Sequence, residues 1–342
     1  MSDLISPRER LLRALHKETV DRAPVICPGG MMNAAIVAVM EAGGNKLPTA
    51  HHDATQMTNL AYDVSTMTGF ENFGIPFCMT IEAEVLGSAI NYGTLECEPK
   101  IQKERFASAA EVIFPPADAF DDNNRVRAVA STIHTLSSRY ADTPVIGSLT
   151  GPISTAASIV DPMTFLKQLR KDKDSSHRVI SQVTDYLIHY AQLLVESGVD
   201  VISIADPTAT GEILGPRMFD EYAVTYLNKL VDAIHAMGKP AIVHICGKME
   251  AVKPSVSQLH GDALSVDAFV SLVKIKQEYP EITTMGNLST ILLEFGEAEK
   301  VESATDELKN KKIDILAPAC GLSTSTPLKN ISTFTAVAKN NG

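Results

Sequence analysis

A histidine and a cysteine stand two positions apart in the apolar segment IVHICGK, residues 242–248. Side chains alternate along a β-strand, so His244 and Cys246 are expected to point to the same face. Imidazole nitrogen and thiolate sulfur are preferred zinc ligands, and the pair could therefore bind a metal ion. A buried histidine and a small buried cysteine can also simply fill a core, so the pair alone leaves both interpretations open.

A second cysteine follows another strand-like segment. Residues 313–317 predict a strand, and Pro318-Ala319-Cys320-Gly321 comes directly after it. In a parallel barrel the carboxyl ends of the strands meet at one face, which would bring Cys320 to the first pair. One imidazole and two thiolates make a zinc site with an open fourth position, which is typical of catalytic zinc. We predict His244, Cys246 and Cys320 as the metal ligands.

The order of the predicted elements indicates such a barrel. Apolar segments predict eight strands, at residues 23–27, 73–77, 143–149, 199–206, 240–246, 263–267, 282–287 and 313–317. Strands that are apolar on both faces and joined by helices pair in parallel, with the helices outside. Eight such units, without the G-x-G-x-x-G fingerprint of a dinucleotide fold, predict an α/β fold of the (β/α)8 TIM-barrel type.

Helix signals separate most of these strands. Ser6-Pro7-Arg8-Glu9 is a capping box with proline at the first helical position, and it predicts a helix over 7–17. Later helices are expected at 125–140, from 162, over 176–197, over 215–238 and from 327. The segment 28–120 shows little periodicity, so elaborated loops or an insertion are expected there. No linker or repeat divides the chain, and we predict one domain over 1–342.

Composition argues against several kinds of partner. The 342-residue chain carries a formal net charge of −11, which disfavours a nucleic-acid groove or an anionic membrane surface. It has no secretory signal and no run of about 18 apolar residues, so we expect a cytoplasmic protein. Its five cysteines are too few and too scattered for a disulfide framework, which leaves their thiols available for a metal.

These residues together resemble a known family. The segments around His244 and Cys320, with TPLKNI at 326–331, are similar to the corrinoid:coenzyme M methyltransferases of the uroporphyrinogen decarboxylase superfamily. RERLLRAL at 8–15 and VDRAPV at 20–25 are typical of the superfamily at large. The histidine and the two cysteines are typical of its zinc methyltransferases, because the decarboxylases need no metal.

The resemblance implies a zinc-dependent enzyme that moves a methyl group from a methylated corrinoid protein to a thiol, with coenzyme M as the first expectation. Zinc held by His244, Cys246 and Cys320 would turn that thiol into a thiolate. The corrinoid would arrive on a separate protein that docks over the barrel mouth. Gly-Gly-Met-Met at 29–32 stands where decarboxylases carry an arginine-rich pattern, which also favours a methyltransferase.

Three more residues are candidates by position or by resemblance. Asp206 ends the strand predicted next to that of His244, and is expected to assist catalysis or bind substrate, unless it caps a helix. Glu84 matches a family position and is expected to assist catalysis by occupying or steering the fourth zinc position, with a solvated surface group as the alternative. Asn287 ends the seventh strand and could donate hydrogen bonds to a substrate, or serve as a turn residue.

Other functions remain open at this point. The acceptor could be another thiol or tetrahydrofolate, since related enzymes share the zinc motif. A metal-free decarboxylase of tetrapyrrole carboxylates is a second reaction class, and a module that only sequesters cobalamin is a third. The sequence names neither the upstream methyl donor nor the oligomeric state, so a homo-oligomer is left open.

Overall fold

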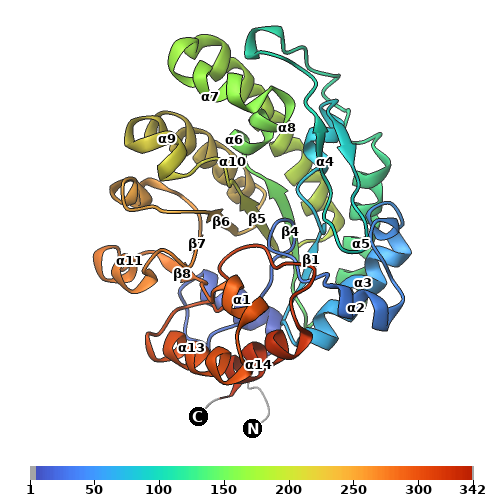
Figure 1. Ribbon diagram of the computed structural model, residues 1–342, viewed down its shortest axis with the longest axis vertical. Helices are drawn as coiled ribbons and strands as arrows, with labels where there is room; N and C mark the ends of the chain where they lie inside the picture. The colour runs from blue at the N-terminus through green and yellow to red at the C-terminus, as the bar shows by residue number, and fades with distance from the viewer. Residues whose placement is uncertain (1–4, 341–342) are drawn as a thin grey trace.

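Short parallel strands form the centre of the structure, a computed structural model that describes residues 5–340 (Figure 1). One sheet runs in the order β1 (Phe73–Ile75), β4 (Val145–Thr150), β5 (Val201–Ala205), β6 (Ala241–Ile245), β7 (Ala263–Val266) and β8 (Thr283–Met285). Every neighbouring pair in this sheet is parallel. Strands β4 to β8 are buried on both faces, as expected for a sheet with helices outside and side chains filling its interior.

Two further segments close this sheet into a ring. Val25 pairs in parallel with Leu316, and Ile315 pairs in parallel with Met285 at the end of β8. On the other side of the first segment, the N–H of Glu71 donates to the carbonyl of Val25 at 3.0 Å, next to β1. The predicted (β/α)8 TIM barrel is therefore confirmed.

The first and last predicted strands form isolated bridges rather than regular strands. In the first predicted strand, the side chain of Asn72 accepts from the N–H of Cys27 and donates to the carbonyl of Cys27, both at 2.9 Å. This amide takes the place that the backbone of a neighbouring strand would otherwise occupy. Nearby, a Cβ on Gly29 would lie only 2.5 Å from the carbonyl carbon of Gly74. The segment around Cys27 is therefore joined to the segment around β1 by a side-chain amide and a close contact between two glycines.

A buried carboxylate holds the same closure together. Glu71 accepts from the backbone N–H of Val25 at 2.9 Å and from Arg22 at 2.6 and 2.8 Å. Arg10 of helix α1 (Pro7–Leu15) is fully buried and donates to Glu71 at 2.8 Å. Arg10 and Arg22 lie in RERLLRAL and VDRAPV, so these superfamily segments have a structural role here.

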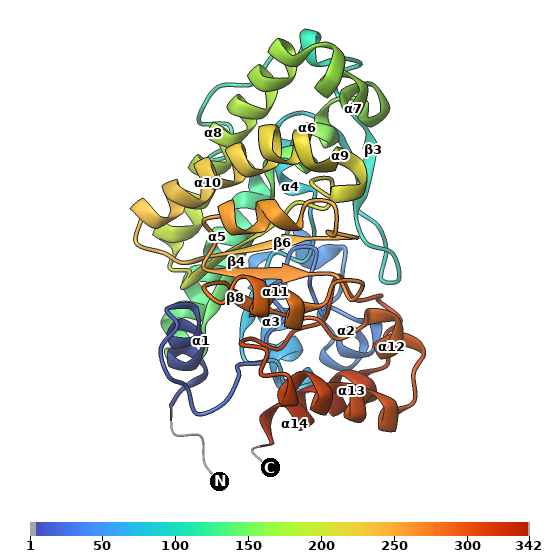
Figure 2. The ribbon, with the colours of Figure 1, turned by 90° about the vertical axis from the view of Figure 1, so that its left-hand side faces the viewer.

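Helix α1 also covers the amino-terminal end of the barrel. Its buried Leu11, Ala14 and Leu15 belong to one cluster with residues of the barrel strands, among them Ile26, Ile146, Val201, Ile242 and Met285. Figure 2 shows α1 on one side of the molecule, while the arrow of β6 points toward the opposite side. Ligands are therefore expected at the carboxyl ends of the strands, where barrel enzymes have their sites.

Helices surround the barrel (Figures 1 and 2). After α1 they are α2 (Val37–Gly43), α3 (Ala54–Thr68), α4 (Ile81–Val85), α5 (Asn124–Arg139), α6 (Pro152–Ile159), α7 (Pro162–Lys171), α8 (Lys173–Ser197), α9 (Gly211–Met218), α10 (Thr225–Ala236), α11 (Leu272–Glu278), α12 (Thr290–Phe295), α13 (Ala298–Asn310) and α14 (Leu328–Lys339). Helix α8 ends at Gly198 with φ 108°, the left-handed stop that the sequence predicts. The helix predicted over 215–238 begins after the non-helical Gly215 and continues through a π-helical turn, Phe219–Val224, into α10. Within the described part of the chain, no helix is long and apolar enough to cross a membrane.

The segment 28–120 contains regular elements that its weak periodicity hides. It holds α2, α3, β1, α4 and an antiparallel ribbon of β2 (Ala89–Asn91) and β3 (Lys100–Lys103). The apolar stripe of α3 consists of Met57, Leu60, Ala61 and Val64, which have helical spacing, although many small and polar residues surround them.

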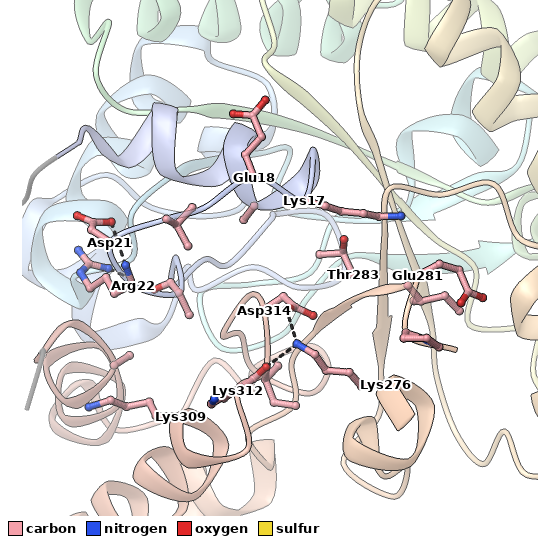
Figure 3. Close-up of a pocket in the computed structure, with 17 residues that line it drawn as sticks. Lys17, Glu18, Asp21, Arg22, Lys276, Glu281, Thr283, Lys309, Lys312 and Asp314 are labelled. Carbon is pink, nitrogen blue, oxygen red and sulfur yellow. Dashed lines mark hydrogen bonds and ion pairs between the residues drawn. The ribbon is translucent and has the colours of Figure 1, made fainter. Parts of the chain in front are cut away.

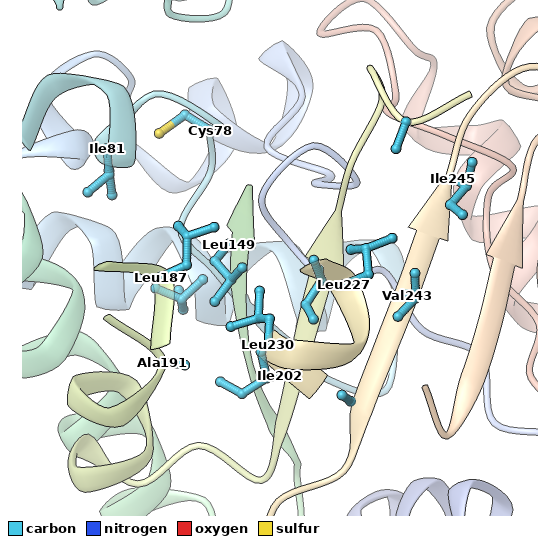
Figure 4. Close-up of a cluster of buried hydrophobic side chains, with 14 of the residues drawn as sticks. Cys78, Ile81, Leu149, Leu187, Ala191, Ile202, Leu227, Leu230, Val243 and Ile245 are labelled. Carbon is cyan, nitrogen blue, oxygen red and sulfur yellow. The ribbon is translucent and has the colours of Figure 1, made fainter. Parts of the chain in front are cut away.

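A large apolar layer lies between the outside of the sheet and the helices. Figure 4 shows part of it, where Leu149, Ile202 and Val243 from neighbouring strands lie beside Leu187 of α8 and Leu230 of α10. All five side chains are nearly or fully buried. This layer fixes the positions of β4, β5 and β6, and β6 carries the first predicted metal ligand.

A cavity of about 700 Å³ opens at the amino-terminal end of the barrel, beside α1 (Figure 3). Lysines and carboxylates line it, and Lys276 makes an ion pair with Asp314 and donates to the carbonyl of Lys312 at 2.7 Å. None of the three predicted metal ligands lines this cavity. It is therefore separate from the candidate metal site.

We expect Glu71→Gln to lower the free energy of unfolding by about 3–5 kcal/mol, because buried guanidinium groups lose their shared carboxylate. Urea unfolding followed by circular dichroism measures the change. Glu9→Gln is the matched control, since Glu9 pairs with Arg13 at the surface and an exposed pair contributes about 1 kcal/mol or less. Equal stability of Glu71→Gln and the wild type would contradict the role of this carboxylate in closing the barrel.

Candidate metal centre

The three predicted ligands meet at the mouth of the barrel. The Nε2 atom of His244 lies 3.1 Å from Sγ of Cys246, which lies 3.5 Å from Sγ of Cys320. All three ligand atoms lie within 4.8 Å of one another. Tetrahedral zinc with bonds of about 2.3 Å to sulfur and about 2.0 Å to nitrogen requires separations of roughly 3.5–3.8 Å. The spacing therefore fits one tetrahedral ion after small side-chain shifts.

The backbone delivers these side chains in two different ways. Alternation along β6 puts the first two on one side, and Gly247 then turns the chain with a φ of 71°. Cys320 is placed by a bridge between strand ends, where the N–H of Ala319 donates to the carbonyl of Leu288 at 2.8 Å. The positions of His244 and Cys246 thus follow from strand geometry, and the position of Cys320 follows from a hydrogen bond between two loops.

His244 is held in one orientation. Its side chain is fully buried, and Nδ1 lies 2.9 Å from the hydroxyl oxygen of Ser265 on β7. A hydrogen bond to one ring nitrogen fixes the tautomer and leaves the other nitrogen to bind a metal. Nε2 is the nitrogen that faces Cys246, so the ring is oriented as a zinc ligand requires.

A hydrogen bond joins the two cysteine side chains, whose Sγ atoms lie 3.5 Å apart. A hydrogen bond from Cys246 lowers the pKa of Cys320 to about 5, with a smaller contribution from His244. The same hydrogen bond, together with burial, raises the pKa of Cys246. This pairing therefore favours the thiolate form of Cys320, which is the form of cysteine that binds zinc.

Comparisons with known proteins extend over nearly the whole chain. Residues 6–341 match the family described as uroporphyrinogen decarboxylase (URO-D). The chain belongs to the URO-D family.

Within this family the chain is similar to methyltransferases. It is 33% identical over 337 residues to methylcobamide:CoM methyltransferase MtbA of Methanosarcina mazei, with 98% of each chain covered. Methylcobamide:CoM methyltransferase MtaA of Methanosarcina barkeri is 29% identical, with 96% of each chain covered. A solved structure of a methyltransferase from Methanosarcina mazei superposes with a TM-score of 0.90 at 28% identity, covering 98% of each chain. The predictions of the family and of a methyltransferase are confirmed.

In this URO-D family member, the carboxylate of Asp206 accepts hydrogen bonds from other residues of the protein. Its carboxylate accepts from the N–H groups of Ile153 and Ser154 at 3.0 and 2.8 Å, and from the Ser154 hydroxyl at 2.6 Å. These amides belong to the first turn of α6, and burial raises the pKa of Asp206 to about 6. The structure places Asp206 as a cap on α6, while its roles in catalysis and substrate binding stay predictions.

Glu84 pairs with a buried arginine. Its carboxylate makes an ion pair with Arg125, whose guanidinium also lies 2.9 Å from Sγ of Cys78 and 3.3 Å from the hydroxyl of Thr80. Among the described residues, Glu84 is not one of those whose ligand atoms gather within 4.8 Å. The structure does not bring Glu84 to the metal ligands, and its catalytic role stays a prediction.

Asn287 is tied to the loop that follows β7. Its amide nitrogen donates to the carbonyls of Asp267 and Val270 at 2.9 and 2.8 Å. Both amide hydrogens are thus used within the protein, which leaves the side-chain oxygen to face a substrate. The substrate-binding role stays a prediction, now for an acceptor rather than a donor.

Sequence reasoning missed the residues that support the ligands. Ser265 orients the histidine, and Sδ of Met31 lies 3.7 Å from a ligand sulfur. The carboxylate of Glu98 accepts from the amide of Asn33 at 3.3 Å, and burial, with the charge of Cys320, raises the pKa of Glu98. A serine within an apolar strand was the available signal for the first, whereas the others come from loops without a pattern.

We expect the URO-D family member to bind about one zinc ion per chain, as a three-ligand site predicts. Cys246→Ser and Cys320→Ser should each lower the retained zinc roughly tenfold or more after dialysis against a chelator, because a hydroxyl replaces a thiolate ligand. Elemental analysis measures the metal directly. Cys97→Ser is the matched control, since Cys97 is an exposed free cysteine. Undiminished zinc in Cys320→Ser would contradict this ligand set.

Asp206→Ala is expected to lower the free energy of unfolding by about 1–3 kcal/mol, because it leaves buried N–H groups of α6 without an acceptor. Its zinc content should match that of the wild type. Asp161→Ala is the comparison, since Asp161 caps α7 by accepting from Thr164 at 2.8 Å. Unchanged stability together with lost activity in Asp206→Ala would instead assign Asp206 to catalysis.

Proposed function

We propose that this URO-D family member is a zinc-dependent methyltransferase, which moves a methyl group from a methylated corrinoid protein to the thiol of coenzyme M. The observation that carries the proposal is the gathering of His244, Cys246 and Cys320 within 4.8 Å at the carboxyl ends of the strands. Relatives named methylcobamide:CoM methyltransferases, matched over nearly the full chain, support the same assignment.

The three side chains would hold zinc through one nitrogen and two sulfurs, which leaves one tetrahedral position for a substrate. Bound zinc lowers the pKa of a coordinated thiol, which is otherwise about 8.5, so that the sulfur is deprotonated at neutral pH. The two cysteine thiolates offset the double positive charge of the ion. The sulfur of a substrate thiol in the fourth position would therefore stay electron-rich and nucleophilic.

The transfer balances without a further reactant. The thiol first loses its proton to solvent, and the sulfur then donates an electron pair to the methyl carbon, which forms the new S–C bond. The Co–C bond breaks with its electron pair on cobalt. Methylcobalt(III) thus becomes cobalt(I), and the product is a methyl thioether.

The surroundings of the three side chains determine the side from which the substrates approach. His244 is fully buried, whereas Cys246 and Cys320 are partly exposed, so the sulfur side of the site is accessible. Helix α1 closes the other end of the barrel, so the donor and the acceptor approach from the same side. The proposal places the enzyme in the cytoplasm, where thiols stay reduced.

The test is to incubate the zinc-loaded protein with methylcobalamin and a panel of acceptors, and to follow the cobalamin spectrum. We expect demethylation with coenzyme M. In Cys320→Ser the rate should fall by about 100-fold or more, because the metal no longer activates the thiol. The panel contains other thiols and tetrahydrofolate.

Cys97→Ser should keep the wild-type rate, since this exposed thiol lies outside the metal group. Reaction with tetrahydrofolate but with none of the thiols would overturn the acceptor. A full rate after complete removal of zinc would overturn the metal dependence.

A further inference from the structure

Three large apolar side chains are exposed at the mouth of the barrel. Phe269 is 72% exposed, Ile291 66% and Phe295 76%, and together we call them the rim patch. Phe269 lies in the loop between β7 and α11, and the other two lie one helical turn apart on α12, which follows β8. Single exposed apolar residues are common, but several on adjoining loops beside a candidate site indicate an interaction surface.

The rim patch is fixed to the segments that carry the metal group. The side chain of Asn287 donates to two carbonyls on either side of Phe269 in the β7–α11 loop. The next residue, Leu288, accepts from the N–H of Ala319, directly before Cys320. Figure 2 shows α12 on the side of the molecule toward which the arrow of β6 points. The patch therefore borders the same opening as the ligand sulfur.

Helix α12 divides its apolar residues between the core and the solvent. In its sequence TILLEF, Leu293 is fully buried, whereas Ile291 and Phe295 are mostly exposed. Residues four positions apart share one face of a helix, so these two form a continuous outward surface. Such a surface gains hydrophobic stabilisation only when a partner covers it.

We propose that the rim patch is the docking surface for the protein that carries the methylated corrinoid. This inference rests on the proposed function and adds the contact residues to it. The methyl carbon must come within bonding distance of a sulfur held beside Cys320, and α1 closes the other end of the barrel. A carrier protein that delivers the methyl group must therefore cover the mouth, and the rim patch offers it an apolar surface there.

Phe269 and Phe295 are the expected anchors of this contact. Aromatic side chains near the centre of an interface contribute most of its binding energy, and surrounding residues mainly exclude water. Each phenyl ring offers a large apolar area that costs little conformational entropy to immobilise. Removing either ring should therefore weaken the encounter with the carrier without disturbing the metal group.

The experiment compares two methyl donors with the same variants. Phe269→Ser and Phe295→Ser are each assayed with free methylcobalamin and with a corrinoid protein of the same organism reconstituted with methylcobalamin. We expect kcat/KM for the protein donor to fall about tenfold or more in each variant. With free methylcobalamin, kcat/KM should stay within about twofold of the wild type, because the substitutions leave the metal group and the chemical step unchanged.

Ile113→Ser is the matched control. Ile113 is 76% exposed but lies between β3 and α5, in a segment held by α8 through a hydrogen bond from Arg178 to the carbonyl of Val112 at 3.2 Å. This variant should keep wild-type kinetics with both donors.

Unchanged kinetics with the protein donor in both phenylalanine variants would overturn the docking surface, as would an equal loss with both donors. A lowered oligomeric mass with unchanged donor kinetics would assign the patch to contact with a second copy instead. A wild-type protein that uses free methylcobalamin but no corrinoid protein also overturns it. Failure of the wild type with both donors is a different result, because it contradicts the proposed function itself.

Discussion

The buried carboxylate of Glu71 is the interaction on which the barrel depends. It joins the segment at Val25 to Arg10 and Arg22, at the point where the first and last strand positions meet. Without that closure, the segment before Cys320 would be the free edge of an open sheet. The gathering of His244, Cys246 and Cys320 is thus a consequence of ring closure, because two of these residues come from the fifth strand position and one from the eighth. The superfamily segments that contain the two arginines accordingly build the barrel and do not select its reaction.

Several polar residues at the mouth organise the backbone around the site. Asp206 caps α6, Asn287 joins the loops after β7 and β8, and Ser265 orients the histidine. A buried polar group must find a partner, and these side chains find theirs within the protein. In the proposed function the chemistry is concentrated on three soft donors, while their neighbours determine where those donors point. This division explains how one barrel architecture can hold reactions that need a metal and reactions that do not.

The sequence by itself determined the features that depend on local pattern. Alternation along a strand was enough to place His244 and Cys246 on one face, and strand-end position was enough to add Cys320. Buried parallel strands between helices led to the barrel, and a glycine stop at Gly198 marked the end of the longest helix. Weak periodicity over 28–120 led to the expectation of elaborated loops or an insertion, whereas the structure has regular helices and strands there. These successes and this failure have the same cause, because strand alternation, helix caps and turns are set by residues close in sequence.

Only the tertiary structure decided the partners of the isolated polar residues. Asp206 binds an amide more than 50 positions away, and Glu84 pairs with Arg125, 41 positions away. Asn287 likewise reaches back to a loop that precedes its own strand. The sequence shows that a carboxylate or an amide stands at a strand end, but its hydrogen-bond partners depend on which elements pack beside it. Local pattern therefore located the donors of the site, whereas packing between distant segments determined what supports them and which polar groups remain available to a substrate.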